Sequence, residues 1–479
     1  MEMEMDSVEG GGRVHVDAAA SSAAKEDGKA RQGTLWTATA HCITAVIGSG
    51  VLALSWSVAQ LGWILGPIAL IAFASITYYT SILLTDCYRS PEPINGIRNP
   101  TYMAAVKSYL GPKHVLLCCI AQYTSLWGSM VSYTITSVTS MREIVRSECN
   151  HKHEIAGCSL SGNSFMVMFG AISILLAQIP NLEELTWLSV MAAVMSFGYS
   201  IISLGLSIAK WISHGDIRGS LMGVVSRKDM SISSASKTWG IFQALGNIAF
   251  AYTYAEVLIE IQDTLKSPPS ENVTMKKATF NGSVITSIFY IAIGCIGYAA
   301  FGNNAPGNIL TGFNEPFWLV DIANAFIIIH LVGAYQVFAQ PIFAFFEDSI
   351  VSKWPENTFF QTGWTIRVPF TKSRSLSIIP AKIILRSVFI IFTTIVSMLF
   401  PFFNEILGLL GAASFWPLTV YFPITMHLSQ RKIARGAPRW FLLQGLSLVC
   451  LVVCFAAMTG SVVGLIDSLR HAKLFHIEY

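Results

Sequence analysis

The chain has 479 residues, of which 53% are hydrophobic and only 12% are charged, with a mean hydropathy of +0.55 and a formal net charge of +3. These values exclude an ordinary soluble domain, in which about a quarter of the residues carry charge. We predict an integral membrane protein that lies in a lipid bilayer and has no nucleic acid partner.

The first 33 residues are rich in Gly, Ala, Ser and charged residues, and they contain no apolar core like that of a cleaved signal peptide. We predict a disordered tail over 1–33. A helix needs about 20 apolar residues to cross the hydrocarbon core of a bilayer, and eleven such segments follow. They fall at roughly 34–60, 63–87, 114–141, 164–180, 185–209, 238–263, 283–302, 316–346, 380–400, 404–427 and 441–467.

The distribution of positive charge predicts how the chain is oriented. If the tail is cytoplasmic, then the cytoplasmic loops and the adjoining helix ends hold most of the 31 Lys and Arg residues. The loop at 347–379 and the segment 429–440 contribute much of this bias, whereas the loop between the fifth and sixth segments opposes it. The positive-inside rule therefore predicts a cytoplasmic N-terminus and, with eleven helices, an extracellular C-terminus.

The first apolar segment contains HCITAVIGSGVLAL, in which Gly48 and Gly50 flank Ser49 near the middle of the membrane. Non-helical backbone is tolerated at that depth only where it lines a cavity, and glycine allows the chain to leave the helix. Free N–H groups at such a break, with the positive end of the following half-helix, suit a carboxylate. The alternative is close helix packing through small residues.

A polar stripe runs along the third segment. Gln122, Ser125, Ser129, Ser132 and Thr136 recur at steps of three and four residues, so they share one face of a helix. The stripe predicts the lining of an aqueous pathway, and the alternative is hydrogen bonding between helices.

Cys149 and Cys158 stand apart from the other cysteines, which lie in or beside apolar helices. Both fall in the loop ECNHKHEIAGCSLSGN, which is predicted to be extracellular, where disulfides persist. We expect a structural bridge between them. His151 and His153 lie in the same loop, but the spacing does not match a zinc motif, and no metal site is predicted.

The sixth segment, LGNIAFAYTYAEVLIEIQDT, places Gly246 and Asn247 at mid-span, and Glu256 follows nine residues after Asn247. A carboxylate near the centre of a bilayer costs at least a few kcal/mol and is usually kept for function. Glu260 and Asp263 share a helix face with Glu256. They lie nearer the cytoplasmic end, where a solvated or ion-paired carboxylate is the ordinary interpretation.

Interrupted helices at corresponding positions, five helices apart, indicate a transporter built from two inverted repeats. The predicted repeats are 34–209 and 238–427, joined by an extracellular loop at 210–237. Helix 11 and a short extracellular tail occupy 428–479. Free N–H groups on helix 1 and free carbonyls on helix 6 suit the carboxylate and the ammonium of an amino acid.

Several long motifs carry a specific resemblance: HCITAVIGSGVLALSWSVAQLGWILGP, LGNIAFAY, LIEIQDTLKSPP, GYAAFGNNAPGNILTG and GAASFWPLTVYFP. From Gly33 to about Leu465 the chain resembles the plant amino acid permease family, in the amino acid/auxin permease group of the LeuT-type superfamily. The resemblance implies an all-α LeuT-type fold of five plus five helices, with discontinuous helices 1 and 6 and an eleventh helix. It also implies proton-coupled uptake of amino acids, usually with broad specificity, across the plasma membrane.

The resemblance also assigns roles to residues. The first break, which would bind the substrate carboxylate, is formed by Ile47, Gly48, Ser49, Gly50 and Val51. The second break, which would receive the ammonium and shape the side-chain pocket, is formed by Ala249, Phe250, Ala251 and Tyr252. His41, about two turns before the first break, is a candidate for proton coupling because an imidazole titrates between an acidic exterior and a neutral interior. The alternative is a hydrogen-bonded structural histidine.

Two residues depart from the family pattern. Many members have Asp where this chain has Asn247, which cannot titrate, and a small or hydroxylated residue where it has Glu256. We count both among the candidate binding residues, and Glu256 also as a candidate proton carrier.

The sequence therefore favours a proton–amino acid symporter, with the proton as co-transported ion and no other cofactor. One alternative is a transporter with different coupling or substrate, such as sodium or auxin. Another is a nutrient sensor that binds amino acids without moving them. An enzyme is not expected, because no nucleophile–base constellation, metal motif or phosphate-binding loop occurs. The sequence assigns no oligomeric state.

Overall fold

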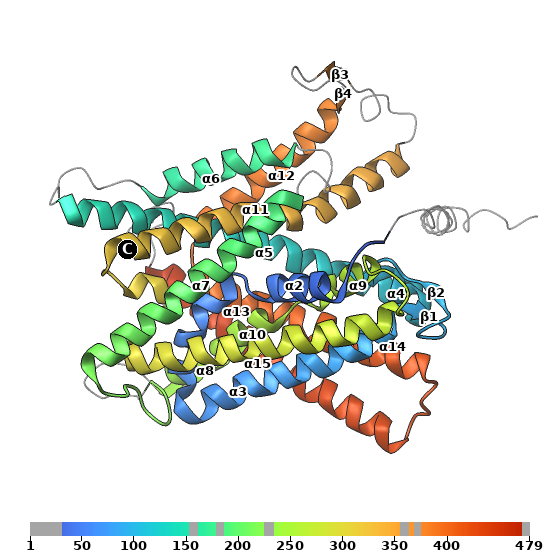
Figure 1. Ribbon diagram of the computed structural model, residues 1–479, viewed down its shortest axis with the longest axis horizontal. Coiled ribbons are helices and arrows are strands. Elements are labelled where there is room, and N and C mark those ends of the chain that lie inside the picture. The colour runs from blue at the N-terminus through green and yellow to red at the C-terminus, as the bar shows by residue number, and fades with distance from the viewer. Residues whose placement is uncertain are drawn as a thin grey trace, which may run out of the picture.

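The computed structural model describes residues 31–152, 161–178, 186–224, 234–354, 364–367 and 375–471. This part of the chain forms a bundle of long helices (Figure 1). The helices are α2 (Leu35–Val46), α3 (Leu54–Asp86), α4 (Tyr102–Leu110), α5 (Pro112–Lys152), α6 (Gly162–Ala177), α7 (Thr186–His214), α8 (Ser234–Tyr252), α9 (Ala255–Asp263), α10 (Glu271–Phe301), α11 (Phe317–Lys353), α12 (Pro380–Leu399), α13 (Phe403–Ser414), α14 (Phe422–Gln430) and α15 (Pro438–His471).

Eight helical segments of the described chain are long and apolar enough to cross a membrane. α6 is shorter, and two further crossings are broken helices. α2 continues through the 3₁₀ turn η2 (Ser49–Ala53) into the start of α3, and α8 continues into α9. α3 itself breaks at Gly62, where φ is +80° and a Cβ atom would stand 2.2 Å from the Gly223 amide nitrogen. Helices thus lie on all eleven segments expected from hydropathy.

The packing of the helices repeats between the two halves. α3 packs on α10, α5 on α11 and α6 on α12. In each pair a helix meets the one five crossings later, as two five-helix repeats related by a two-fold axis would give. α15, the eleventh crossing, packs on α8 and α13.

The crossing of α8 and α13 is close because both helices present glycine. A Cβ atom on Gly411 would stand 2.0 Å from the Gly246 carbonyl oxygen, and one on Gly246 would stand 2.5 Å from the Gly408 carbonyl oxygen. Backbones that approach in this way are typical of helix packing in membranes. The contact fixes the last turns of α8, immediately before the second break.

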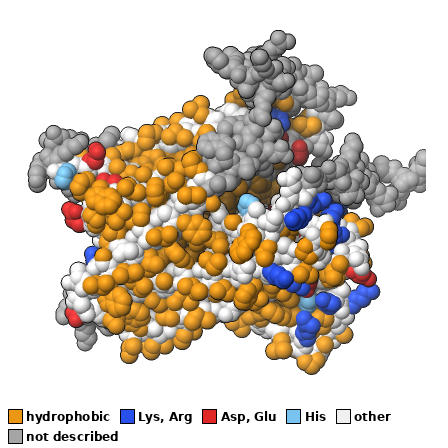
Figure 2. All heavy atoms as spheres, viewed as in Figure 1, with side chains coloured by type: hydrophobic (Ala, Val, Ile, Leu, Met, Phe, Trp, Pro, Cys, Tyr) orange, Lys and Arg blue, Asp and Glu red, His pale blue; other side chains and the backbone are white. Residues whose placement is uncertain are grey.

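The surface separates an apolar flank from a basic end. Hydrophobic side chains cover the flank formed by the long helices, and Lys and Arg gather at the end where α4, α14 and the hairpin β1–β2 lie (Figure 2). We call this the basic end. β1 (Arg89–Ser90) and β2 (Ile97–Arg98) are antiparallel, as are β3 (Trp364–Arg367) and β4 (Ser375–Ile378).

Three local features lie outside the expectations from sequence. α4 is a short helix in the loop after α3, capped by the Thr101 side chain and ended by Gly111 at a φ of +82°. Short 3₁₀ turns, η6 (Gly302–Asn304) and η7 (Ile309–Gly312), precede α11. Between α13 and α14 the chain widens into a π-helical stretch, η9 (Phe415–Tyr421), which contains Pro417, and proline prevents a regular turn.

Candidate functional site

The first break lies between α2 and η2. The Ile47 N–H still donates to the Ile43 carbonyl at 2.8 Å, and the Gly48 N–H turns back to the Val46 carbonyl at 2.9 Å. A new helix starts at Ser49, and the first N–H groups of a helix have no partner within it. The Ser49 hydroxyl is buried and has no hydrogen-bond partner among the described residues. The break thus offers donors to an anionic group.

The two glycines of this break differ in their surroundings. A Cβ atom on Gly50 would stand 3.0 Å from the Cα atom of Ala251, so Gly50 lets the first break touch the second. A Cβ atom on Gly48 would meet nothing within 4 Å. Gly48 therefore faces free space at the cavity and makes no close packing contact there.

The second break lies between α8 and α9. The Thr253 N–H donates to the Phe250 carbonyl at 3.0 Å, and the Thr253 hydroxyl donates to the Ala249 carbonyl at 2.8 Å. α9 starts two residues later, at Ala255, with Glu256 in its first turn. Backbone carbonyls at the end of α8 and a carboxylate at the start of α9 give this break an acceptor character.

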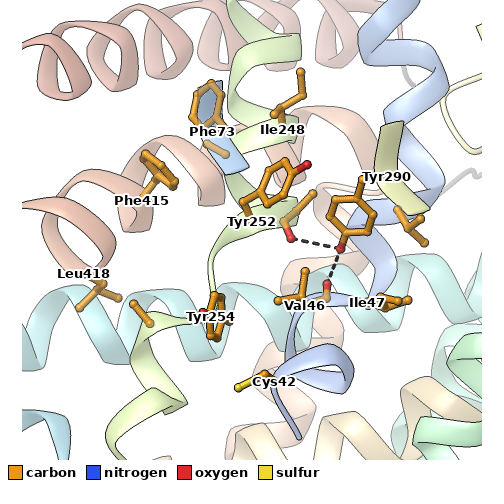
Figure 3. Packing of buried hydrophobic residues seen from close by; sticks show 14 of the residues in the cluster. Cys42, Val46, Ile47, Phe73, Ile248, Tyr252, Tyr254, Tyr290, Phe415 and Leu418 are labelled. Atoms are coloured by element: carbon orange, nitrogen blue, oxygen red, sulfur yellow. Dashed lines mark hydrogen bonds between the residues drawn. The ribbon is translucent and has the colours of Figure 1, made fainter. Parts of the chain in front are cut away.

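Tyrosine hydroxyls from two other helices hold the broken ends. Tyr290 of α10 donates to the Val46 carbonyl and lies 3.2 Å from the Ala251 carbonyl, so a single hydroxyl spans both breaks (Figure 3). Tyr199 of α7 donates to the Gly48 carbonyl at 3.0 Å. These bonds satisfy carbonyls that have left the helical pattern, which would otherwise be costly in a dry interior.

A cavity of about 30 Å³ lies between the two breaks. Its walls come from both breaks, from α5 and from α11: Ala45, Val46, Gly48, Ser49, Gly50, Ser125, Ser129, Tyr133, Phe250, Ala251, Thr253, Glu256 and Phe338. Binding sites for small molecules usually measure several hundred Å³, whereas this volume holds only water. The structure therefore shows the two breaks closed on each other.

The polar stripe of the third segment is divided by the structure. Ser125 and Ser129 line the cavity, and the next turn adds Tyr133, which the sequence analysis left out. Gln122 lies beside the cavity, where its side-chain amide donates to the Glu256 carbonyl at 3.3 Å. Ser132 is buried outside the lining, and its carbonyl accepts the Thr136 hydroxyl at 2.7 Å. Ser125 and Ser129 therefore line the cavity, whereas Ser132 and Thr136 are buried away from it.

Glu256 is the only acidic residue of the described chain that lines this cavity. Its side chain is 5% exposed, and Ser125 forms a hydrogen bond with the carboxyl group. Its Oε2 atom is buried without a partner among the described side chains. A group of this kind can hold a proton or meet a cationic part of a substrate.

Other residues predicted for the breaks lie outside the lining. Ile47, Val51 and Ala249 are buried with at most 1% of their surface exposed, and they pack away from the cavity. Tyr252 also stays outside; its ring meets that of Tyr290 edge to face, with 5.1 Å between centroids. These four residues support the breaks and do not line the space between them.

Asn247 is buried on α8 and does not line the cavity. Its side-chain amide donates to the Asn404 carboxamide oxygen at 3.3 Å, and its own oxygen would be 3.1 Å from a Cβ atom on Gly408. Both contacts are with α13. Asn247 therefore contributes to the packing of α8 against α13.

His41 lies on α2 with an exposed side chain, and it does not line the cavity. The structure does not bring it together with Glu256. The ring of His330 meets that of Tyr199, with 5.7 Å between centroids. Its Nδ1 atom lies 2.8 Å from the Ala192 carbonyl, which gives it a packing role.

The tyrosines that hold the breaks were missed by sequence reasoning. Tyr199 and Tyr290 stand inside apolar helices, where a phenol hydroxyl must find a partner. That signal was present, but the partners are backbone carbonyls on another helix, which no local pattern reveals.

Contacts at the end of α9 also close the protein between the cavity and the basic end. Arg31 pairs with Asp263 at 3.0 Å, and the Tyr88 hydroxyl donates to the same carboxylate at 2.7 Å. Gly33 pairs in parallel with the chain after α9: its N–H donates to the Thr264 carbonyl at 2.8 Å. Burial and the bond to Asp263 raise the pKa of Tyr88, so it stays a donor at physiological pH.

The predicted extracellular bridge falls partly outside the described residues. Cys149, near the end of α5, is disulfide-bonded, and Cys158 lies outside the described part of the chain. The pairing of the two therefore stays a prediction. Seven other cysteines are free thiols.

Comparisons with known proteins agree with this architecture. A family model described as "Transmembrane amino acid transporter protein" matches residues 31–467. Amino acid permease 6 of Arabidopsis thaliana is 53% identical over 457 residues, which cover 94% of each chain. Amino acid permease 3 of the same plant is 51% identical over 95% of each chain. Lysine histidine transporter-like 6 is 30% identical over 90% of this chain and 89% of its own.

Among solved structures, the chain resembles Mhp1, a nucleobase-cation-symport-1 family transporter in a closed conformation with bromovinylhydantoin bound. The TM-score is 0.51 at 13% sequence identity, and the match covers 92% of both chains. At this identity the likeness concerns the fold alone. It confirms the predicted LeuT-type fold of two five-helix repeats with broken helices 1 and 6.

Proposed function

The chain belongs to the transmembrane amino acid transporter family, alongside the plant amino acid permeases, and on that premise we propose that it is a proton-coupled symporter. It imports amino acids across the plasma membrane with broad specificity. Amino acid transport follows from the family. Coupling to protons, location in the plasma membrane and the orientation of the chain in that membrane are proposed.

Substrate binding is proposed at the two breaks. The N–H groups that open η2, with the free Ser49 hydroxyl, receive the substrate carboxylate. The carbonyls that end α8 and the Glu256 carboxyl group receive the ammonium. Tyr133, Phe250 and Phe338 surround the substrate side chain. These walls are aromatic and largely apolar, so they can accept many different substrate side chains and do not select a single one.

Glu256 carries the proposed proton coupling. It is buried and lines the cavity between the breaks, where we propose that the substrate binds. A proton bound from an acidic exterior removes a charge that would cost at least a few kcal/mol at membrane depth. The loaded site can then move between its two orientations, and the proton leaves on the other side. His41 is the second candidate, to be tested by substitution, because it lies outside the cavity.

The driving force is sufficient for concentrative uptake. One pH unit is worth about 1.4 kcal/mol per proton, and 100 mV is worth about 2.3 kcal/mol per charge. A gradient of about two units with about 150 mV gives roughly 6 kcal/mol, which corresponds to accumulation on the order of 10⁴-fold.

The orientation is proposed from charge. The hairpin β1–β2 and α4 lie at the basic end, Arg31 pairs with Asp263 at the end of α9, and positive residues favour the cytoplasmic side. The N-terminus is then cytoplasmic and the C-terminus extracellular. An N-terminal epitope tag that binds antibody only after permeabilisation of the cell supports this assignment, and binding to intact cells opposes it.

Current recordings in a heterologous cell test the function. We expect an amino acid to evoke inward current that grows as external pH falls, and sodium removal to leave it unchanged. Dependence on sodium would replace the proton by another ion. Binding of labelled amino acid without uptake or current would indicate a sensor.

A further inference from the structure

A second carboxyl group follows Glu256 along α9. Glu260 lies one turn further from the cavity, and one of its oxygens accepts the N–H of Tyr102 at 3.1 Å, at the start of α4. Its other oxygen, Oε2, is shielded from solvent and has no partner among the described residues. Glu256 is in the same state, with a buried and unpartnered Oε2. In the closed form, neither Oε2 atom forms a hydrogen bond with the described residues that would stabilise the fold.

The carboxyl groups of α9 lie in a row from the cavity towards the basic end. Side chains four residues apart on a helix have Cβ atoms about 5–6 Å apart, so Glu256 and Glu260 are neighbours. Asp263 comes almost one turn later, where Arg31 and Tyr88 bind it. The row therefore starts in the cavity lining and ends at the contacts that close the basic end.

The surroundings of the first two groups differ from those of the third. Among the described residues, neither Glu256 nor Glu260 has an ion pair with Lys, Arg or His; the charged group near Glu256 is Glu260, and the one near Glu260 on its other side is Asp263. The titratable side chains that face the pair are Tyr102 on α4 and Cys118 and Tyr133 on α5, with Cys87 behind Tyr102. Two carboxyl groups without a cation suit proton sites, whereas Asp263 pairs with Arg31.

We infer that Glu260 is a second proton site, which takes the proton from Glu256 and releases it at the basic end. The inference rests on the proposed proton-coupled function and adds the exit route. The O–H bond at Glu256 breaks, an O–H bond forms at Glu260, and Glu256 is left as the carboxylate. The proton then passes to water when the contacts of Asp263 open. The Tyr102 N–H holds one oxygen of Glu260 and leaves the other to receive the proton.

Glu260 also caps α4, and the test must separate the two roles. Glu260→Gln keeps an oxygen for the Tyr102 N–H but cannot carry a proton, whereas Glu260→Ala loses both. Glu92→Gln removes an exposed carboxylate in the hairpin loop and serves as the control. Each variant is compared with the natural chain for net amino acid uptake, proton current, and exchange of internal for external amino acid, each corrected for the amount of protein at the surface.

In Glu260→Gln we expect net uptake and proton current to fall at least tenfold, while exchange stays within about twofold of the natural chain, because exchange does not require the proton to leave. Glu92→Gln stays normal in all three measurements. Proton current and net uptake at the natural level in Glu260→Gln, with loss only in Glu260→Ala, would reduce Glu260 to a cap and overturn the inference. If the natural chain takes up amino acid without proton current, the proposed function itself fails, and the relay with it.

Discussion

The hydroxyl of Tyr290 donates to the carbonyl of Val46, and it thereby ties α10 to the end of α2. The same hydroxyl lies 3.2 Å from the Ala251 carbonyl, at the end of α8. One phenol thus serves the two places where helices break, in the closed form of the site. A group with this position is expected to set how readily the two breaks separate and rejoin.

Removal of that hydroxyl tests its role. In Tyr290→Phe a buried carbonyl loses its donor, which costs about 1–3 kcal/mol, so we expect transport to fall at least about fivefold with a normal amount of protein at the surface. Tyr252→Phe is the matched control, because its ring packs on Tyr290 but its hydroxyl bonds to neither break. Equal loss in both variants, or in neither, would contradict the assigned role. Uptake of labelled amino acid against surface biotinylation is the measurement.

Substitution of the two glycines of the first break by alanine should impair the protein in different ways. Gly48→Ala adds a methyl group to free space, so the protein should fold and reach the surface while its apparent affinity for amino acids weakens by about tenfold. Gly50→Ala places its methyl group against Ala251, 3.0 Å from that Cα atom. It should reduce both thermal stability and transport. Detergent-solubilised protein, followed by fluorescence-detected size exclusion after heating, separates the two effects. A stable, fully active Gly50→Ala would refute the close contact of the breaks.

Glu256 predicts substrate selectivity. Its carboxyl group lines the cavity, and while it is ionised, before it binds the proton, it repels the like charge of an acidic substrate by on the order of 1–3 kcal/mol in a partly hydrated site. We expect the natural chain to prefer lysine to glutamate, and Glu256→Ser to shift the ratio towards glutamate by roughly tenfold. Competition against labelled alanine at one fixed pH gives the ratio. An unchanged ratio in the variant would remove Glu256 from substrate contact.

The Arg31–Asp263 pair predicts how the basic end opens. Each partner is about 15% exposed, at 13% and 16%, and Tyr88 shares the carboxylate. In Arg31→Ala we expect faster efflux of preloaded amino acid, by about three- to fivefold, because the contacts that close this end are weakened. Arg435→Ala removes an exposed positive residue from the same end of the protein and should leave efflux unchanged. Slower efflux in Arg31→Ala would show that the pair is needed for opening.

The sequence predicted the membrane class, the eleven crossings and the two breaks because each depends on residues that are close in the chain. Hydropathy over about 20 residues predicts a crossing, and Gly48 and Gly50 mark a break without help from elsewhere. The fold class was also accessible, since interrupted helices five crossings apart indicate inverted repeats. Ser125 and Ser129 were found in the same way, from the spacing along one helix.

The tertiary structure decided which of those residues meet. Asn247 and Glu256 lie in one segment, yet Asn247 turns to Asn404 on α13 while Glu256 lines the cavity with α5. Tyr290 reaches carbonyls on α2 and α8 that are 244 and 39 positions away in the chain. The face that a residue presents follows from local periodicity, but what that face meets follows from the packing of distant helices. That packing depends on glycine contacts such as Gly411 against Gly246, which only the folded backbone brings together.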